Sequence, residues 1–304
     1  MKKKIEVHQR KGIIGASDVG AILGISPYST PYEAYLAYTG QEIEHSPETI
    51  EIMRMGTELE EFISQQVMRI YDCKLRRCNS AFFNPETPYI ICHPDRIEVG
   101  LDDNGQRVGV EIKSSSVYDK SWGEEDTDQV PYSYLCQCLM YMYCGVCDVV
   151  KLYRFSNNKI TRYIIRQNVQ LINKIVEKLK KFKADADAGI APAAVSISDI
   201  KTRWAIADKD KALANEDIKQ KLAAFKAIKA EQDISKKNLD KLQVDICNYI
   251  ADANFLVDDD FETVLATFKN QTRSRFDSKR FKLEQPELSE LFTETKDIRV
   301  LLIK

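Results

Sequence analysis

The sequence predicts a mixed α/β fold for residues 1–190, followed by a separate C-terminal part. Between residues 48 and 71 apolar residues recur with the period of an α-helix, whereas residues 74–113 form short strand-like runs separated by turn residues. Alanines and a proline follow residue 190, and the chain beyond them is rich in helix formers. We therefore expect an α/β domain over 1–190, a linker over 191–207 and an accessory domain over 208–304.

The N-terminal elements are predicted from their ends. Ser17 or Asp18 can begin a short helix that runs through Leu23. The segment Thr30-Pro31-Tyr32-Glu33 combines a threonine cap, a proline at the first helical position and a glutamate three residues after the cap. This helix should end at Gly40, because glycine adopts the left-handed conformation that closes many helices.

The middle of the chain alternates between the two kinds of element. A helix over 48–71 is followed by strand-like runs, and residues 114–130 are polar, which predicts a mobile loop. The remaining expected elements are strands at 81–83, 89–92 and 108–113, a buried helix from Pro131 to about Cys144, strands at 147–155 and 159–166, and a helix at 169–187.

The C-terminal part is predicted to be helical and then α+β. Apolar residues over 208–252 form an amphipathic stripe, and we expect two antiparallel helices joined near Asp233-Ile234-Ser235, with one long helix as the alternative. A small α+β region should follow, with a strand at 261–268, a helix at 286–292 and a last strand at 298–303.

Composition excludes some classes of protein. A net charge of −2 over 304 residues argues against coating nucleic acid by bulk charge, but it is compatible with a basic surface confined to one channel. No apolar run approaches the roughly 20 residues that cross a membrane, and the basic N-terminus lacks the apolar segment of a secretory signal. We therefore expect a cytoplasmic protein with reduced thiols.

Four of the eight cysteines lie close together in the sequence. Cys144 and Cys147 have a spacing seen in metal and redox sites, and Cys136 and Cys138 lie nearby. Two positions on a helix point about 200° apart, which works against a shared cluster. Since free cysteine is usually a small buried hydrophobe, packing is the expected role and an iron–sulfur cluster is not expected.

The most informative motif is His93-Pro94-Asp95 followed by Glu111-Ile112-Lys113. Asp95 should end one strand and Glu111 should end another, so that two carboxylates and a lysine meet. Those groups bind a hard divalent cation and activate water for cutting a phosphodiester. The alternative is a surface pair between Glu111 and Lys113. His93 is expected to be structural or to support a metal ligand without binding the metal, because Mg²⁺ prefers oxygen ligands.

Residues 8–170 resemble the YqaJ-like phage recombinase nucleases, which are relatives of bacteriophage lambda exonuclease in the PD-(D/E)XK nuclease superfamily. Four blocks of sequence match. The first is Arg10-x-Gly12-x-Ile14-x-Ala16-Ser17-Asp18, continuing to Leu23-Gly24-x-Ser26-Pro27-Tyr28 and Thr30-Pro31-Tyr32, and the second is Met55-Gly56-Thr57-Glu58-Leu59-Glu60. The third is Pro94-Asp95 with Glu111-Ile112-Lys113, and the fourth is Val130-Pro131-Tyr132 through Tyr134-Leu135-Cys136-Gln137 with Tyr141. The resemblance implies a restriction-endonuclease-like core, with a central mixed sheet flanked by helices.

The resemblance also implies a metal site. Asp95, Glu111 and the backbone carbonyl of Ile112 would hold Mg²⁺, for which Mn²⁺ can substitute. Lys113 would orient the attacking water or stabilise charge in the transition state. Glu60 matches a helix glutamate that binds the metal directly or through water, although neighbouring glutamates also suit a solvated helix face.

Two further pairs are implied to hold substrate. Gln137 and Tyr141 share a helix face and resemble a pair that positions the phosphate or the lysine; a hydrogen-bonded buried glutamine is the structural alternative. Arg10 and Ser17 match positions that hold the 5′ phosphate of the degraded strand. Ser17 also suits a simple helix cap.

Basic residues and phenylalanines interleave near the C-terminus, which suits either contact with DNA or a solvated surface over two core rings. The possible DNA contacts are Arg273, Arg275, Lys279 and Arg280, beside Phe276 and Phe281.

The predicted function is a metal-dependent exonuclease that resects linear double-stranded DNA ends 5′ to 3′. It would leave a 3′ single strand for an annealing or recombinase protein, and relatives imply a homo-trimer. One alternative is a structure- or sequence-specific endonuclease on the same core. Another is a catalytically inactive DNA-end binding module, against which the intact Asp95, Glu111 and Lys113 set argues.

Overall fold

The computed structural model describes residues 11–41, 43, 46–115, 118–207, 211–295 and 298–303. The chain divides into two compact units, Met1–Arg203 and Trp204–Lys304. Arg10 lies outside the described residues. In the described part of the chain, no helix is both long and apolar enough to cross a membrane.

A mixed five-stranded sheet forms the centre of the first unit, in the order β2-β5-β6-β7-β8. Strand β6 pairs antiparallel with β5 and parallel with β7. The strands are β2 (Leu75–Arg77), β5 (Arg96–Glu98), β6 (Val108–Ser114), β7 (Val149–Ser156) and β8 (Lys159–Arg166). A second, smaller sheet contains β1 (Ile14–Gly15), β4 (Ile90–Cys92) and β3 (Phe82–Phe83).

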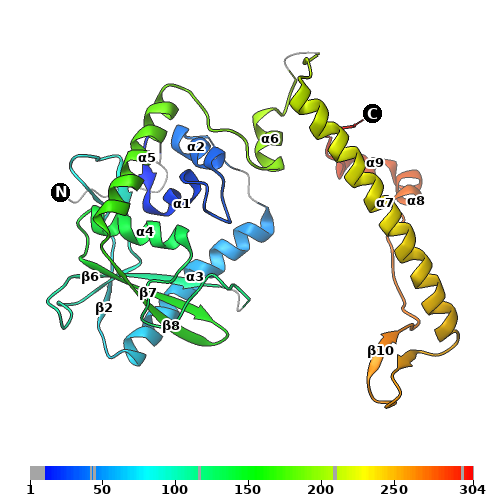
Figure 1. Ribbon diagram of the computed structural model, residues 1–304, viewed down its shortest axis with the longest axis horizontal. Helices are drawn as coiled ribbons and strands as arrows, with labels where there is room; N and C mark the ends of the chain where they lie inside the picture. The colour runs from blue at the N-terminus through cyan, green and yellow to red at the C-terminus, as the bar shows by residue number, and fades with distance from the viewer. Residues whose placement is uncertain are drawn as a thin grey trace. The chain divides into compact units, whose positions relative to one another are not determined.

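Helices cover both faces of the central sheet (Figure 1). Helices α4 (Tyr132–Tyr143) and α5 (Val169–Asp187) pack on one face with the buried side chains of β7 and β8. Helix α3 (Pro47–Ile70) packs on the other face, where Ile63 and Val67 belong to a second apolar cluster. This mixed α/β arrangement confirms the predicted fold class.

The alternation of side chains along β6 separates packing from chemistry. Val108, Val110 and Ile112 belong to the apolar cluster under α3. Because successive strand residues point to opposite faces, Glu111 and Lys113 project towards α4 instead. One short strand therefore contributes both core side chains and the polar end of a site.

Local capping determines the N-terminal elements. Helix α2 (Pro31–Thr39) begins with the predicted capping box at Thr30, whose hydroxyl accepts from the Glu33 amide at 3.1 Å. It ends at Gly40, which adopts a left-handed φ of 78° as predicted. The 3-10 helix η1 (Ala16–Asp18) and α1 (Val19–Ile22) precede it, and both pack against α4.

Helix α6 (Ile197–Arg203) lies in the segment expected to be a linker. Its buried Asp199 accepts a hydrogen bond from the Thr30 hydroxyl at 2.7 Å and from the backbone amides of Val195 and Ser196. The first unit therefore extends to this helix rather than ending at residue 190.

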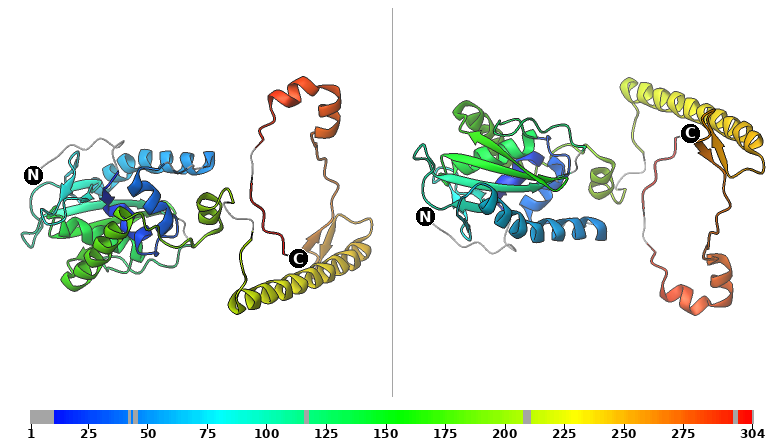
Figure 2. Two further views of the ribbon diagram at one scale, coloured as in Figure 1. Left: turned by 90° about the horizontal axis from the view of Figure 1, so that it is seen from above. Right: turned by 90° about the horizontal axis from the view of Figure 1, so that it is seen from below.

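The predicted helical hairpin in the C-terminal unit is wrong. Residues 216–250 form one continuous helix, α7 (Glu216–Ile250), which Figure 2 shows without a break. The expected joint at Asp233-Ile234-Ser235 contains neither glycine nor proline and lies between strong helix formers, so nothing there stops the helix. Its apolar stripe is exposed, with Leu239 66% and Leu242 57% accessible.

The rest of this unit is only partly as expected. Strand β10 (Val264–Thr267) is shorter than the predicted strand and pairs antiparallel with β9 (Phe255–Val257). Helices α8 (Ser278–Glu284) and α9 (Pro286–Leu291) follow, and α9 confirms the predicted helix. The strand predicted at 298–303 is wrong, because these residues pair with no described strand.

Candidate active site

Asp95 lies at the end of the central sheet, directly before β5. Its Oδ2 accepts a hydrogen bond from the Ile112 amide at 2.7 Å. In an extended strand, the amide and carbonyl of one residue point to the same side. The Ile112 carbonyl therefore faces the same edge of β6 as Asp95.

Glu111 is the buried centre of the site, with an accessible fraction of 1%. Its Oε1 accepts from Gln137 Nε2 at 2.7 Å and lies 2.5 Å from Lys113 Nζ. Its Oε2 accepts from the Tyr141 hydroxyl at 2.6 Å. Buried carboxylates need such donors, so the three neighbours keep Glu111 in one orientation.

Charges of one sign are crowded around β6. Burial, and then repulsion from Glu111, raise the pKa of Asp95 well above its usual range. The same two causes raise the pKa of the half-buried Glu60 on α3. Burial alone would lower the pKa of Lys113, but the carboxylates of Glu111 and Asp95 outweigh it and raise the pKa. A cation placed among these carboxylates would relieve the repulsion.

The donors fit a hard divalent cation. Mg²⁺ is typically held by one or two carboxylates and keeps several of its waters. Asp95, Glu111 and the Ile112 carbonyl offer only oxygen. Across the described ranges, no three His, Cys, Asp or Glu side chains are grouped closely enough to hold a metal. The candidate donor set is therefore two carboxylates and one carbonyl, and Glu60 is not within such a group.

Gln137 and Tyr141 lie one turn apart on α4 and both contact Glu111. Gln137 Nε2 also donates to the Tyr141 hydroxyl at 2.7 Å. The Tyr141 hydroxyl lies 3.4 Å from the His93 carbonyl, so this histidine contributes its backbone to the site. The predicted shared face is confirmed, and in this arrangement the pair supports the carboxylate of Glu111.

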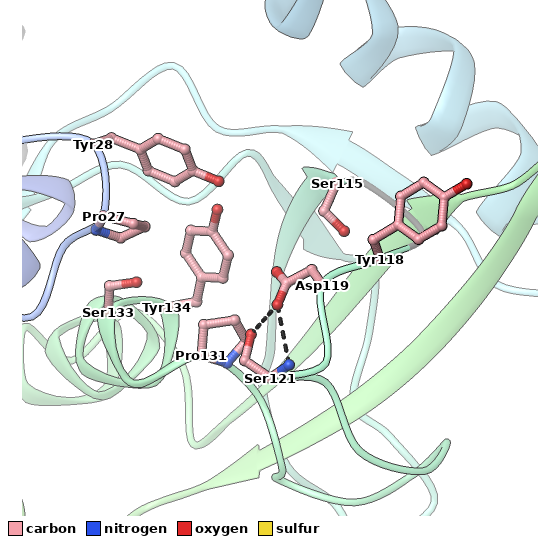
Figure 3. A pocket seen from close by; sticks show the side chains of 9 residues that line it. All are labelled: Pro27, Tyr28, Ser115, Tyr118, Asp119, Ser121, Pro131, Ser133 and Tyr134. Carbon is pink, nitrogen blue, oxygen red and sulfur yellow. Dashed lines mark hydrogen bonds between the residues drawn. The ribbon is translucent and has the colours of Figure 1, made fainter. Parts of the chain in front are cut away.

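A cavity of about 460 Å³ lies beside the lysine (Figure 3). Lys113 Nζ is 5.1 Å from the centroid of the Tyr134 ring, which is one wall of the cavity. Figure 3 shows the hydroxyls of Tyr28 and Tyr134 pointing towards each other. The lining residues are Pro27, Tyr28, Ser115, Tyr118, Asp119, Ser121, Pro131, Ser133 and Tyr134. Tyrosines and serines thus dominate the lining, and none of the described residues that form it is a lysine or an arginine.

Parts of the matching sequence blocks line this cavity, although their residue types alone did not predict a cavity. Two of the four matching blocks, Ser26-Pro27-Tyr28 and Val130-Pro131-Tyr132 through Tyr134, supply neighbouring parts of the lining (Figure 3). The two blocks are brought together where Gly20 of α1 approaches Ser133 at the start of α4. A Cβ on Gly20 would lie 2.8 Å from the Ser133 Cβ, so only glycine fits without a shift.

The other residues singled out in the sequence are Ser17, the cysteines and the C-terminal basic residues, and their surroundings differ. Ser17 is exposed on η1, which packs against α4. The buried cysteines Cys92 and Cys144 have their sulfurs 2.9 Å apart, but no described cysteines form a metal-binding group. In the C-terminal unit Arg273, Arg275, Lys279 and Arg280 are all exposed, and Arg280 pairs with Glu284 at 2.7 Å.

Residues 7–148 match the model of the YqaJ-like viral recombinase domain. This match confirms the resemblance found in the four sequence blocks. An uncharacterized protein YqaJ from Bacillus subtilis (strain 168) is 27% identical over 297 residues, which cover 93% of this chain and 88% of that protein.

Two solved structures are similar at low identity. An alkaline exonuclease, LHK-Exo, from Laribacter hongkongensis is 18% identical with a TM-score of 0.46, covering 60% of this chain and 91% of that one. A phage-related exonuclease from Haemophilus somnus 129PT is 17% identical with a TM-score of 0.43, covering 59% of this chain and 95% of that one.

Proposed function

We propose that this protein is a metal-dependent deoxyribonuclease that degrades linear double-stranded DNA from its ends. The observation that carries the proposal is the Glu111 cluster, where a buried carboxylate, a lysine and a glutamine–tyrosine pair meet beside Asp95. An acidic site with one ammonium and only oxygen atoms as candidate metal ligands suits phosphodiester hydrolysis better than redox or acyl chemistry.

Asp95, Glu111 and the Ile112 carbonyl would hold Mg²⁺, and Mn²⁺ could replace it. When bound, the ion supplies Lewis acidity and a lowered pKa for a bound water. Lys113 is 23% accessible, so its ammonium can reach a substrate oxygen. Its raised pKa keeps it protonated near neutral pH, which makes it a donor to developing negative charge rather than a base.

The direction of digestion is proposed to be 5′ to 3′, leaving a 3′ single strand. Arg10 and Ser17 would bind the 5′ phosphate, with Ser17 on η1 beside α4. The family match to a viral recombinase domain supports a role in recombination, with an annealing or recombinase protein as partner. Glu60 would support the metal through water. The proposal also includes assembly into a homo-trimer. It further includes DNA contacts in the C-terminal unit, at Arg273, Arg275, Lys279 and Arg280.

The experiment is a time course on linear duplex DNA with one strand labelled at its 3′ end, prepared with a phosphate or a hydroxyl at its 5′ end. Digestion from the 5′ end gives labelled fragments that shorten stepwise, whereas digestion from the 3′ end releases the label at once. We expect stepwise shortening that requires Mg²⁺ and is faster with the phosphate. Ser17→Ala should remove that preference.

Covalently closed circular DNA of the same sequence is the control. An exonuclease leaves it intact, whereas an endonuclease linearises it. Cleavage of the circle, or immediate release of the 3′ label, contradicts the proposed direction and end dependence. Absence of any metal-dependent cleavage contradicts the nuclease proposal as a whole.

A further inference from the structure

Arg96 is a buried arginine that follows Asp95 directly and is only 4% accessible. Its guanidinium makes three contacts with two parts of the chain. Nη1 donates to the Asp95 carbonyl at 2.8 Å, Nη2 donates to Glu61 Oε2 at 2.9 Å, and Nε donates to Ser64 Oγ at 3.2 Å. The first contact fixes the Asp95 turn, and the other two hold the middle of α3.

These contacts join two segments that otherwise belong to different layers. Asp95 lies at the end of the sheet, whereas Glu61 and Ser64 lie on the helix that packs on the sheet face opposite α4. Glu60, the neighbour of Glu61, is the half-buried helix glutamate whose pKa is raised by burial and by Glu111, and it is proposed to support the metal through water. The contacts to Glu61 and Ser64 therefore link the middle of α3 to the Asp95 turn.

The burial of Arg96 excludes direct contact with DNA, since the guanidinium is covered by the protein itself. The planar fork of arginine matches three acceptors in a fixed geometry, which a lysine ammonium on a flexible stem does not reproduce. Residues that orient ligands in this way have large effects on metal sites, and their loss typically costs about 10- to 100-fold in metal affinity or activity.

We propose that Arg96 is a positioning residue that holds the Asp95 turn and the Glu60 turn of α3 in the arrangement that binds the divalent cation. This inference rests on the proposed metal site. It assigns a role to a residue that contacts neither metal nor substrate and acts through Asp95, Glu61 and Ser64.

The test uses the full chain and measures Mn²⁺ binding by isothermal titration calorimetry, without DNA. Arg96→Lys keeps the charge but loses the fork, and Glu61→Gln weakens one contact while leaving the buried guanidinium in place. The matched control is Arg77→Gln, because Arg77 is exposed and its Nε is 3.7 Å from the same Glu61 oxygen. Thermal unfolding in EDTA measures the folded fraction of each variant.

We expect Arg96→Lys to weaken Mn²⁺ binding by about 10- to 100-fold. Glu61→Gln should weaken it in the same direction by less, and Arg77→Gln should leave it unchanged. A purely structural arginine would lower the unfolding temperature without changing the Mn²⁺ affinity of the folded protein. That result overturns the proposal, and so does a wild-type Mn²⁺ affinity in both Arg96→Lys and Glu61→Gln. Absence of Mn²⁺ binding by the wild-type protein overturns it as well.

The binding measurement separates this inference from the proposed nuclease activity. If the wild-type protein digests DNA but Arg96→Lys binds Mn²⁺ normally, only the positioning role fails. If Arg96→Lys weakens Mn²⁺ binding but the wild-type protein cuts no DNA, only the nuclease proposal fails.

Discussion

Replacing Tyr141 with phenylalanine removes one oxygen from the centre of the site and leaves the ring in place. Tyr141 is 1% accessible, and its hydroxyl donates to Glu111 Oε2 at 2.6 Å and accepts from Gln137 Nε2 at 2.7 Å. A hydrogen bond to a charged group contributes about 1.5–3 kcal/mol to the free energy of unfolding. For a unit of this size, that loss should lower the unfolding temperature by about 3–12 °C.

The assay is differential scanning calorimetry of the full chain in EDTA, with Tyr143→Phe as the control. Tyr143 lies on the same helix, but its hydroxyl pairs at 2.9 Å with the neutral hydroxyl of Thr87, so its loss should cost less, about 0.5–1.5 kcal/mol. Tyr141→Phe should also lower DNA cleavage by about 10- to 100-fold, because it loosens the proposed metal ligand Glu111.

A Tyr141→Phe protein that unfolds at the wild-type temperature refutes the reasoning, because the bond to Glu111 would then contribute nothing. Equal shifts for Tyr141→Phe and Tyr143→Phe contradict it as well, since the charge on Glu111 is what distinguishes the two tyrosines.

Three further predictions concern α6, the cavity and the cysteines. Asp199→Asn should lose about 1–2 kcal/mol of stability at pH 7. Although burial opposes it, the hydrogen bonds from Val195 and Thr30 lower the pKa of Asp199, so this stability is present above the ordinary aspartate value of about 3.9 and is lost as pH falls through the lower folded value. The melting temperatures of the two proteins should therefore differ at pH 7 and converge as the pH is lowered progressively below about 3.9, and a constant difference contradicts the assignment. Tyr28→Ala should raise KM for linear DNA by weakening a stacking contact of about 1–3 kcal/mol, with kcat little changed, whereas Tyr132→Ala, which is equally exposed but outside the cavity, should not. Aerobically purified protein should show no absorbance near 400 nm; a band there, together with bound iron, contradicts the packing role of the cysteines.

The parts of the fold that depend on local chemistry were predictable. The ends of α2 follow from Thr30 and Gly40, whose capping preferences act within a few residues. The meeting of Glu111 and Lys113 on one face follows from strand alternation. The one-turn spacing of Gln137 and Tyr141 on α4 likewise follows from helix geometry alone.

The parts that depend on distant partners were not predictable. No pattern marked Arg96, because an arginine after an aspartate is common and its acceptors Glu61 and Ser64 lie more than 30 residues away. The single helix α7 differs from the predicted hairpin because an apolar stripe indicates a face to be covered but not what covers it. A strand at 298–303 likewise needs a partner strand, which periodicity alone does not provide.

The most direct test of the proposed centre is the single-turnover rate of cleavage of linear duplex DNA in Mg²⁺ by the wild-type protein and by Lys113→Ala. Because Lys113 pairs with the buried Glu111, thermal unfolding measures the folded fraction of Lys113→Ala, and the cleavage rate is expressed per folded, DNA-bound protein. Losing one preorganised donor to the transition state should slow cleavage by about 10²- to 10³-fold. Cleavage by Lys113→Ala at the wild-type rate would contradict the assignment of this site as the catalytic centre.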